Sequence, residues 1–339
     1  MSDAFVSLQN LSLAYGKTVV VPDLDLDIRK GELIALLGPS GCGKTTTMRA
    51  IAGLMSLHGG SISIDGVDMS RTPANKRGIG LVFQSYALFP HLNAFENVAF
   101  GLRLKKLPSA EIKERVEGGL EKVGLAHLAD RKPAEMSGGQ QQRLSLARSL
   151  VMEPKVLLLD EPLSNLDARL RLEMRTELQR VQRDTGITMV FVTHDQSEAL
   201  ALADRIVLMK DGVIEQLGTP DDLYNRPETV FAADFFGFEN IFEVSGSDII
   251  GRESRAPIGF AAADGHLAWR PGAVKIGSGS HKGIVRGVAF AGEQREYVID
   301  SPLGQIKASC PASEKAHTLE ESIVFDLPKV GALAIPARR

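Results

Sequence analysis

The feature that most constrains this chain is a glycine-rich run at residues 38–45, which matches GxxxxGK[ST]. The apolar segment Leu33–Leu37 precedes it and is typical of a buried strand, while residues 45–54 follow with the pattern of a helix. In this setting glycines let backbone N–H groups converge on an anion at the helix N-terminus. The alternative is a glycine-rich turn with a chance lysine, and the flanking strand and helix favour phosphate binding. The chain is therefore predicted to bind a nucleoside triphosphate.

The phosphate-binding residues are expected to be the loop and the first residues of the helix. They are Gly38, Pro39, Ser40, Gly41, Cys42, Gly43, Lys44, Thr45 and Thr46. Lys44 would reach the β- and γ-phosphates, which also makes it a catalytic residue, and the Thr45 hydroxyl would ligate Mg²⁺. A helix N-terminus can lower a thiol pKa, but no chemistry here requires Cys42 to react.

Composition limits the class of protein. The 339 residues favour two domains, and 44% hydrophobic with 24% charged residues is ordinary for a soluble protein. The net charge of −3 gives no sign of non-specific nucleic-acid binding, so no nucleic-acid partner is expected. Cys42 and Cys310 cannot form a disulfide framework, which indicates a reducing compartment. No apolar stretch is long enough to span a membrane, so we expect a cytosolic protein or one held at a membrane by another protein.

Hydrophobic periodicity predicts an α/β cassette followed by an all-β domain. An antiparallel β layer is expected before and after the glycine-rich run, and alternating strands and helices up to about residue 215 indicate a mainly parallel core sheet. Helices are predicted at about 108–131, 139–152, 166–184 and 196–203. Beyond about residue 239, short strands at 283–291, 293–300, 304–310 and 321–327 predict a small β-barrel. The expected domains are 1–238, with a helical subdomain at about 86–153, and 239–339.

Two further patterns point to phosphate chemistry. The apolar strand Val156–Asp160 ends in Asp160 and Glu161; the first would hold Mg²⁺ and the second would act as a general base on the attacking water. The alternative is that Asp160 and Glu161 form only an acidic strand end that caps the next helix. Ser137, Gly138, Gly139 and Gln140 open a helix and would form a second anion site, although Ser-Gly-Gly is also an ordinary N-cap. Two phosphate sites in one chain make sense if two copies share each nucleotide.

With these motifs in order, residues 5–236 resemble the ATP-binding cassette (ABC) ATPases. Residues 137–140 resemble the family signature, with Met136 where leucine is usual, and Leu157 to Glu161 resemble Walker B. The resemblance also implies a role for four other residues: Gln84 as the Q-loop glutamine that offers an oxygen to Mg²⁺, Asp167 in the D-loop, His194 as the switch histidine at the γ-phosphate, and Tyr15 as the aromatic residue that stacks on adenine. Taken singly, Gln84, His194 and Tyr15 could each be structural; their order favours function.

The resemblance further implies an importer. The apolar segment 85–92 after Gln84 is expected to be an exposed loop. It resembles the region where importer ATPases receive a permease, with a local hydrophobic plug as the alternative. The resemblance implies separate permease subunits, a homodimer of this chain and a periplasmic or lipoprotein solute-binding protein. It also implies a place on the cytoplasmic face of the bacterial inner membrane. The C-terminal strands with Trp269, Arg270 and Pro271 resemble the small oligomer-binding-like (TOBE) domain of such ATPases.

The substrate is less constrained. Residues 140–143 and 88–91 are closest to the polyamine, ferric-iron and phosphonate branches, and polyamine is preferred over iron or 2-aminoethylphosphonate. The alternatives are an ABC ATPase acting on DNA or ribosomes and a stand-alone nucleotide sensor. The sequence shows neither a sustained heptad run nor a second phosphate loop, which disfavours the first of these.

Overall fold

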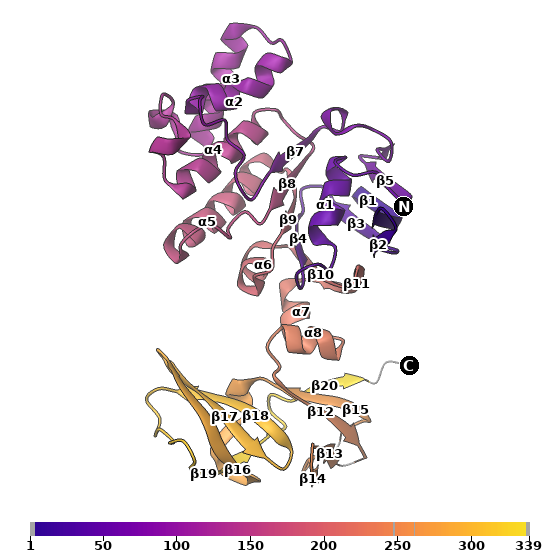
Figure 1. Ribbon diagram of the computed structural model, residues 1–339, viewed down its shortest axis with the longest axis vertical. Helices are drawn as coiled ribbons and strands as arrows, with labels where there is room; N and C mark the ends of the chain where they lie inside the picture. The colour runs from indigo at the N-terminus through magenta and orange to yellow at the C-terminus, as the bar shows by residue number, and fades with distance from the viewer. Residues whose placement is uncertain (1–3, 247, 261, 337–339) are drawn as a thin grey trace. The chain divides into compact units, whose positions relative to one another are not determined.

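The chain forms two compact units, with the division between Pro220 and Asp221 (Figure 1). The computed structural model describes residues 4–246, 248–260 and 262–336. None of the helices in these residues is long and apolar enough to span a membrane.

The first unit contains the predicted antiparallel layer. Strand β1 (Ala4–Tyr15) lies at its centre and pairs with β2 (Thr18–Val21), β3 (Leu26–Arg29) and β5 (Gly59–Ile64), and β5 pairs with β6 (Val67–Asp68). Val6, Leu8, Leu11 and Leu13 of β1 are all buried. This apolar side of the layer faces the core of the unit.

The second layer is a six-stranded sheet in the order β11-β10-β4-β9-β8-β7. Its strands are β4 (Leu33–Leu37), β7 (Ile79–Val82), β8 (Val156–Asp160), β9 (Thr188–Val192), β10 (Arg205–Lys210) and β11 (Val213–Gly218). All neighbours are parallel except β10 and β11. Helix α1 (Lys44–Ala52) contributes Met48 and Ile51 to one hydrophobic core that also contains residues of β1 and β4, so the helix packs between the two sheets.

The helical part of this unit has three main helices, α2 (Ala94–Leu104), α3 (Ser109–Lys122) and α4 (Gly138–Leu150). Sequence reasoning did not predict α2 and extended α3 to about residue 131. Helix α3 ends earlier because Gly124, with a φ of 67°, breaks it before the short 3₁₀ turn Ala126–Leu128. Helices α5 (Ala168–Thr185) and α6 (Gln196–Leu202) lie where helices were predicted.

The second unit is built from two antiparallel sheets. One has the order β14-β13-β12-β15-β20 and the other β18-β17-β16-β19. The strands are β12 (Asn240–Ser245), β13 (Asp248–Ile250), β14 (Arg255–Pro257), β15 (Gly265–Trp269), β16 (Lys275–Ala291), β17 (Gln294–Ser301), β18 (Gly304–Pro311), β19 (Ser322–Asp326) and β20 (Leu333–Pro336). Phe242 and Trp269 from one sheet share a core with Tyr297 and Phe325 from the other. Pairing among the described residues therefore gives two packed sheets rather than one closed barrel.

Arg270, in the Trp-Arg-Pro tripeptide, has a structural role. Its guanidinium lies 3.8 Å from the ring centre of Tyr224 and 4.2 Å from that of Phe238, and it donates hydrogen bonds to the carbonyls of Tyr224 and Phe236. These contacts attach α7 (Pro220–Asn225) and α8 (Val230–Phe235) to the β sheets. Residues 221–238 consequently belong to the second unit, whereas the predicted boundary at 238 and 239 assigned them to the first.

Candidate nucleotide site

The glycine-rich run connects β4 to α1, as predicted. Gly38 has a φ of 146°, and a Cβ there would lie 2.3 Å from the carbonyl oxygen of Met209. Gly43 has a φ of 100°, and its Cβ would lie 2.9 Å from Cγ2 of Val21. Both positions therefore require glycine, and the loop packs too closely on β10 and β2 to accept a side chain.

Lys44 folds back over the loop that precedes it. Its Nζ donates hydrogen bonds of 2.7 Å to the carbonyls of Gly38 and Pro39, and the residue is only 6% exposed. Both acceptors are neutral, so they leave the positive charge of the ammonium group uncompensated. A buried cation in this position favours binding of an anionic phosphate.

Asp160 lies at the carboxyl end of β8, next to the loop. Its Oδ1 is 3.5 Å from Oγ1 of Thr45, at the start of α1. Burial raises the pKa of Asp160, and the neighbouring Glu161 adds to this effect, while Arg49 and the Thr45 hydrogen bond oppose it. A carboxylate that is penalised by burial gains stability when a cation neutralises it. These two oxygens suit Mg²⁺, which commonly takes one or two protein oxygens together with phosphates and water.

The Glu161 carboxylate contacts two other predicted site residues, Gln84 and His194. Its Oε2 accepts a hydrogen bond of 2.9 Å from Nε2 of Gln84, and its Oε1 lies 3.2 Å from Nδ1 of His194. These residues follow β7, β8 and β9, which are adjacent strands of the sheet. Glu161 has a left-handed backbone with a φ of 44°, and its N–H donates to the carbonyl of Val192 at 3.1 Å. The structure thus brings together Gln84, Glu161 and His194 at one sheet edge.

Two residues near this cluster were outside the predicted site. Ser164 Oγ accepts a hydrogen bond of 3.2 Å from Gln84, and Asn165 donates one of 3.0 Å to the Gln84 carbonyl. They fix both ends of that glutamine. Their place in the D-loop, beside Asp167, was the signal that could have identified them.

The signature residues and Asp167 cap helices. Ser137 and Gln140 form a reciprocal capping box at the start of α4, and Asp167 accepts a hydrogen bond of 2.9 Å from the Leu170 N–H at the start of α5. Figure 1 shows α4 and α1 on opposite sides of β7 and β8. The signature therefore begins a helix on the other side of these strands from α1, the helix that follows the glycine-rich loop.

Tyr15 ends β1, and its side chain is partly open to solvent. The residue is 51% exposed. An aromatic ring in this state has a free face on which a base can stack. The geometry is compatible with the expected adenine contact.

The segment 85–92 is more buried than expected. Leu88, Phe89 and Leu92 are half-buried, and the Phe89 ring packs at 4.4 Å against the ring of Phe100 from α2. Asn97 accepts from the Phe89 N–H at 2.8 Å and donates to its carbonyl at 3.1 Å. The exposed apolar side chains beside this segment are instead Phe83 and Phe100, at 40% and 39%. The expectation of an exposed apolar loop is corrected accordingly, because sequence reasoning had not foreseen α2.

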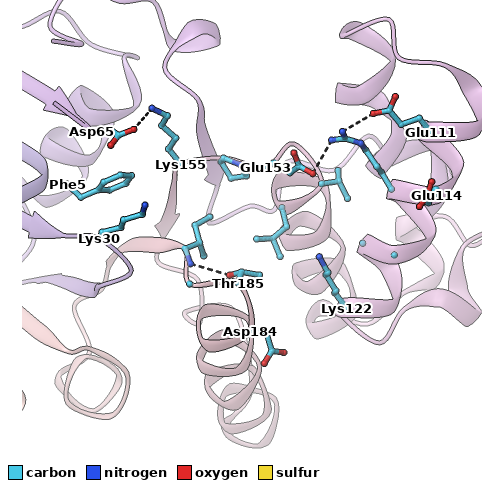
Figure 2. Close-up of a pocket in the computed structure, with 18 residues that line it drawn as sticks. Phe5, Lys30, Asp65, Glu111, Glu114, Lys122, Glu153, Lys155, Asp184 and Thr185 are labelled. Carbon is cyan, nitrogen blue, oxygen red and sulfur yellow. Dashed lines mark hydrogen bonds and ion pairs between the residues drawn. The ribbon is translucent and has the colours of Figure 1, made fainter. Parts of the chain in front are cut away.

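A large cavity of about 980 Å³ lies at another place in the first unit (Figure 2). Its walls include Pro154 and Lys155 before β8 and Gly186 and Ile187 before β9. It therefore opens at the amino ends of strands whose carboxyl ends carry Glu161 and His194. Ion pairs line it, including Lys155 with Asp65 at 2.7 Å, as Figure 2 shows. Ligands of parallel sheets bind at the carboxyl ends, so this cavity is distinct from the nucleotide site.

A glycine-rich loop at a strand-to-helix junction, with acids at the end of the neighbouring strand, defines a P-loop ATPase. Comparison with known proteins places the chain within this class. Residues 21–164 match the family model described as "ABC transporter". Among solved structures, the chain is 32% identical to a dimeric ATP-binding cassette, MJ0796, in a post-hydrolysis state with ADP and Pi, with a TM-score of 0.57 and coverage of 63% of this chain and 98% of that one. It is also 32% identical to cbiO1 of Clostridium perfringens, part of the ABC transporter complex cbiONQ, with a TM-score of 0.63 and coverage of 69% and 95%.

Relatives that match over nearly the whole chain support the same class. The chain is 45% identical to the Fe(3+) ions import ATP-binding protein FbpC 1 of Rhizobium meliloti, with 97% of each chain covered. It is 47% identical to FbpC of Photobacterium profundum, with 99% of each covered. The chain belongs to the ABC transporter family. It is an importer-type ATP-binding subunit, and its activity is ATP hydrolysis coupled to transport, which confirms the predicted fold class and general function.

Proposed function

We propose that this chain energises import of ferric iron through separate permease subunits at the cytoplasmic face of a bacterial inner membrane. The observation that carries the catalytic part is the shared carboxylate of Glu161, held between Gln84 and His194 beside Asp160 and Thr45. The names of the curated relatives support iron among the three expected substrates. The preference from sequence therefore changes from polyamine to ferric iron. A solute-binding protein outside the membrane would deliver the ion.

In this proposal the loop residues and Lys44 bind the phosphates of ATP, and Tyr15 stacks on the adenine. Thr45 and Asp160, with Gln84, would hold Mg²⁺, which neutralises phosphate charge when bound. Glu161 accepts a proton from the attacking water, because its carboxylate is oriented by hydrogen bonds on both oxygens. His194, at the end of β9, faces Glu161 with Nδ1 and would contact the γ-phosphate with Nε2; donation from both ring nitrogens at once requires the imidazolium form.

Two copies are proposed to close around two ATP molecules. The capped N-terminus of α4 at Ser137, Gly138 and Gly139 offers N–H groups and a positive dipole to a phosphate. Its place in the helical part favours an ATP bound to the second copy. The dimeric relative with ADP and Pi supports such an arrangement. Closure would then move the permease subunits.

The substrate is tested by uptake in cells that lack this gene. Restoring the wild-type gene should restore uptake of radioactive ferric iron, and restoring Glu161→Gln should not. Spermidine and 2-aminoethylphosphonate uptake are measured in the same cells. Restored uptake of either of these without iron would reject the iron assignment and leave the ATPase assignment intact.

A further inference from the structure

The segment after Gln84 has an unusual backbone. Tyr86 and Ala87 are consecutive residues with left-handed φ values of 61° and 47°. Residues with a Cβ disfavour this conformation, so other contacts must hold it. Helix α4 supplies them: Ser145 Oγ and Arg148 Nη2 donate to the Tyr86 carbonyl at 2.9 and 3.0 Å, and Arg148 Nη1 donates to the Ala87 carbonyl at 2.7 Å.

The Tyr86 side chain reaches the other end of the same helix. A Cβ built on Gly138, the first residue of α4, would lie 4.0 Å from the Tyr86 hydroxyl and 3.8 Å from Cδ2 of Leu166. The Tyr86 carbonyl is therefore bonded to Ser145 in α4, and the Tyr86 hydroxyl lies near Gly138 at the start of the same helix. This connection joins the segment that follows Gln84 to the helix that begins at Ser137.

The hydroxyl itself is buried and has no hydrogen-bond partner within the described part of the chain. Burial also raises the pKa of Tyr86. A buried hydroxyl without a partner costs free energy, and such groups are few in native proteins. Phenylalanine would fill the same space without that cost. The hydroxyl beside Gly138 therefore calls for a functional explanation.

We propose that Tyr86 is a positioning residue that couples the two nucleotides of the closed dimer. The segment that carries it follows Gln84, which serves the nucleotide of its own chain. Its hydroxyl gains a hydrogen bond at the start of α4 when the dimer closes, and this fixes the signature against the ATP of the second copy. The inference rests on the two-copy closure proposed above.

The test compares Tyr86→Phe with its parent in a Glu161→Gln background, which slows hydrolysis. Sedimentation across an ATP titration gives the ATP concentration at which half of the protein is dimeric, and titration calorimetry at concentrations that keep the protein monomeric gives its ATP affinity. Tyr86→Phe should raise the half-point by about fivefold or more, since one hydrogen bond is lost at each of two sites. Monomer affinity and thermal stability should stay the same, or stability should rise.

Tyr297→Phe is the matched control. The Tyr297 hydroxyl accepts a hydrogen bond of 3.3 Å from the His317 N–H in the second unit, so this variant should lose thermal stability and keep the dimerisation half-point. An unchanged half-point in Tyr86→Phe would overturn the inference, as would an equal loss of monomer affinity or a lower melting temperature. If the Glu161→Gln parent stays monomeric with ATP, two-copy closure fails, and the inference fails with it.

Discussion

Oε1 of Glu161 lies 3.2 Å from Nδ1 of His194, while Oε2 of the same carboxylate accepts a hydrogen bond of 2.9 Å from Gln84. Three neighbouring strands thus contribute one side chain each to a single contact network. The carboxylate cannot rotate without breaking one of the two contacts. This pre-orientation is what a general base needs before water arrives.

Replacing Glu161 with glutamine should separate binding from turnover. The amide has nearly the same shape but cannot accept a proton, so ATP affinity should persist while turnover falls by about 10²–10⁴-fold. Steady-state phosphate release and nucleotide titration measure the two quantities. Glu173→Gln is the control, because Glu173 pairs only with Arg169 on the exposed side of α5 among the ion pairs of the described residues. Near-normal turnover in Glu161→Gln would rule out the base role.

Replacing Lys44 with alanine should instead weaken binding. The variant loses the buried ammonium group over the loop and its bonds to the Gly38 and Pro39 carbonyls. We expect ATP affinity to fall by about 10–100-fold in calorimetric titration, since charge-assisted hydrogen bonds are lost. Lys113→Ala, on the exposed face of α3, should bind as the wild type does. Equal affinities in the two variants would contradict the phosphate role of Lys44.

Replacing Asp160 with asparagine should stabilise the nucleotide-free protein while ending activity. Burial raises the pKa of Asp160 in the folded protein above its pKa in the unfolded chain. The protonated carboxyl therefore contributes stability that is fully present below the unfolded-state pKa and is lost as pH rises through the folded-state pKa. The melting temperature of Asp160→Asn should therefore exceed that of the wild type by more at pH 8 than at pH 4.5.

Melting curves without nucleotide at both pH values measure this difference. Asp130→Asn, at an exposed position, serves as the control and should show no such trend. A constant difference between Asp160→Asn and the wild type across the pH range would mean that the ionisation of Asp160 does not penalise folding.

Substitution of the exposed Phe100 is a better test of permease docking than substitution of Phe89. Phe89 packs between Phe100 and Arg148, so a charge there would disturb the fold. Phe100→Asp should leave ATPase activity of the isolated protein near normal and abolish both transport and the stimulation of hydrolysis by permease in proteoliposomes. Leu172→Asp on α5 replaces another exposed apolar residue and should keep both. If permease still fully stimulates ATP hydrolysis by Phe100→Asp, the permease docks on another surface.

Sequence predicted the nucleotide cassette well because its motifs are local. A glycine-rich loop needs only a strand before it and a helix after it, and residues 33–54 supply both. The meeting of Gln84, Glu161 and His194 followed from parallel strand ends. Helix α2 was missed although Asn93 caps it through the Glu96 N–H and Val98, Ala99 and Leu102 line one face. Its apolar residues continued those of the preceding loop, which hid the helical period.

Other features depend on distant residues and leave no pattern in the sequence. The hydrogen bonds from Arg148 to Tyr86 and Ala87 join residues about sixty positions apart. Likewise, the second unit includes α7 and α8 because Arg270 lies against Tyr224 and Phe238. Nothing in the local composition of either segment indicates these partners. Only the packed structure reveals them.

The left-handed backbone at Glu161 has a consequence for how the protein fails under stress. No glycine supplies that conformation, so the surrounding sheet must impose it, in part through the bond from Glu161 N–H to the Val192 carbonyl. On gentle heating or in dilute denaturant, we expect this residue to relax to a commoner conformation before the strands separate. Catalysis should then stop while the circular dichroism spectrum is unchanged, and cooling should restore it. Loss of activity would thus precede unfolding and be reversible.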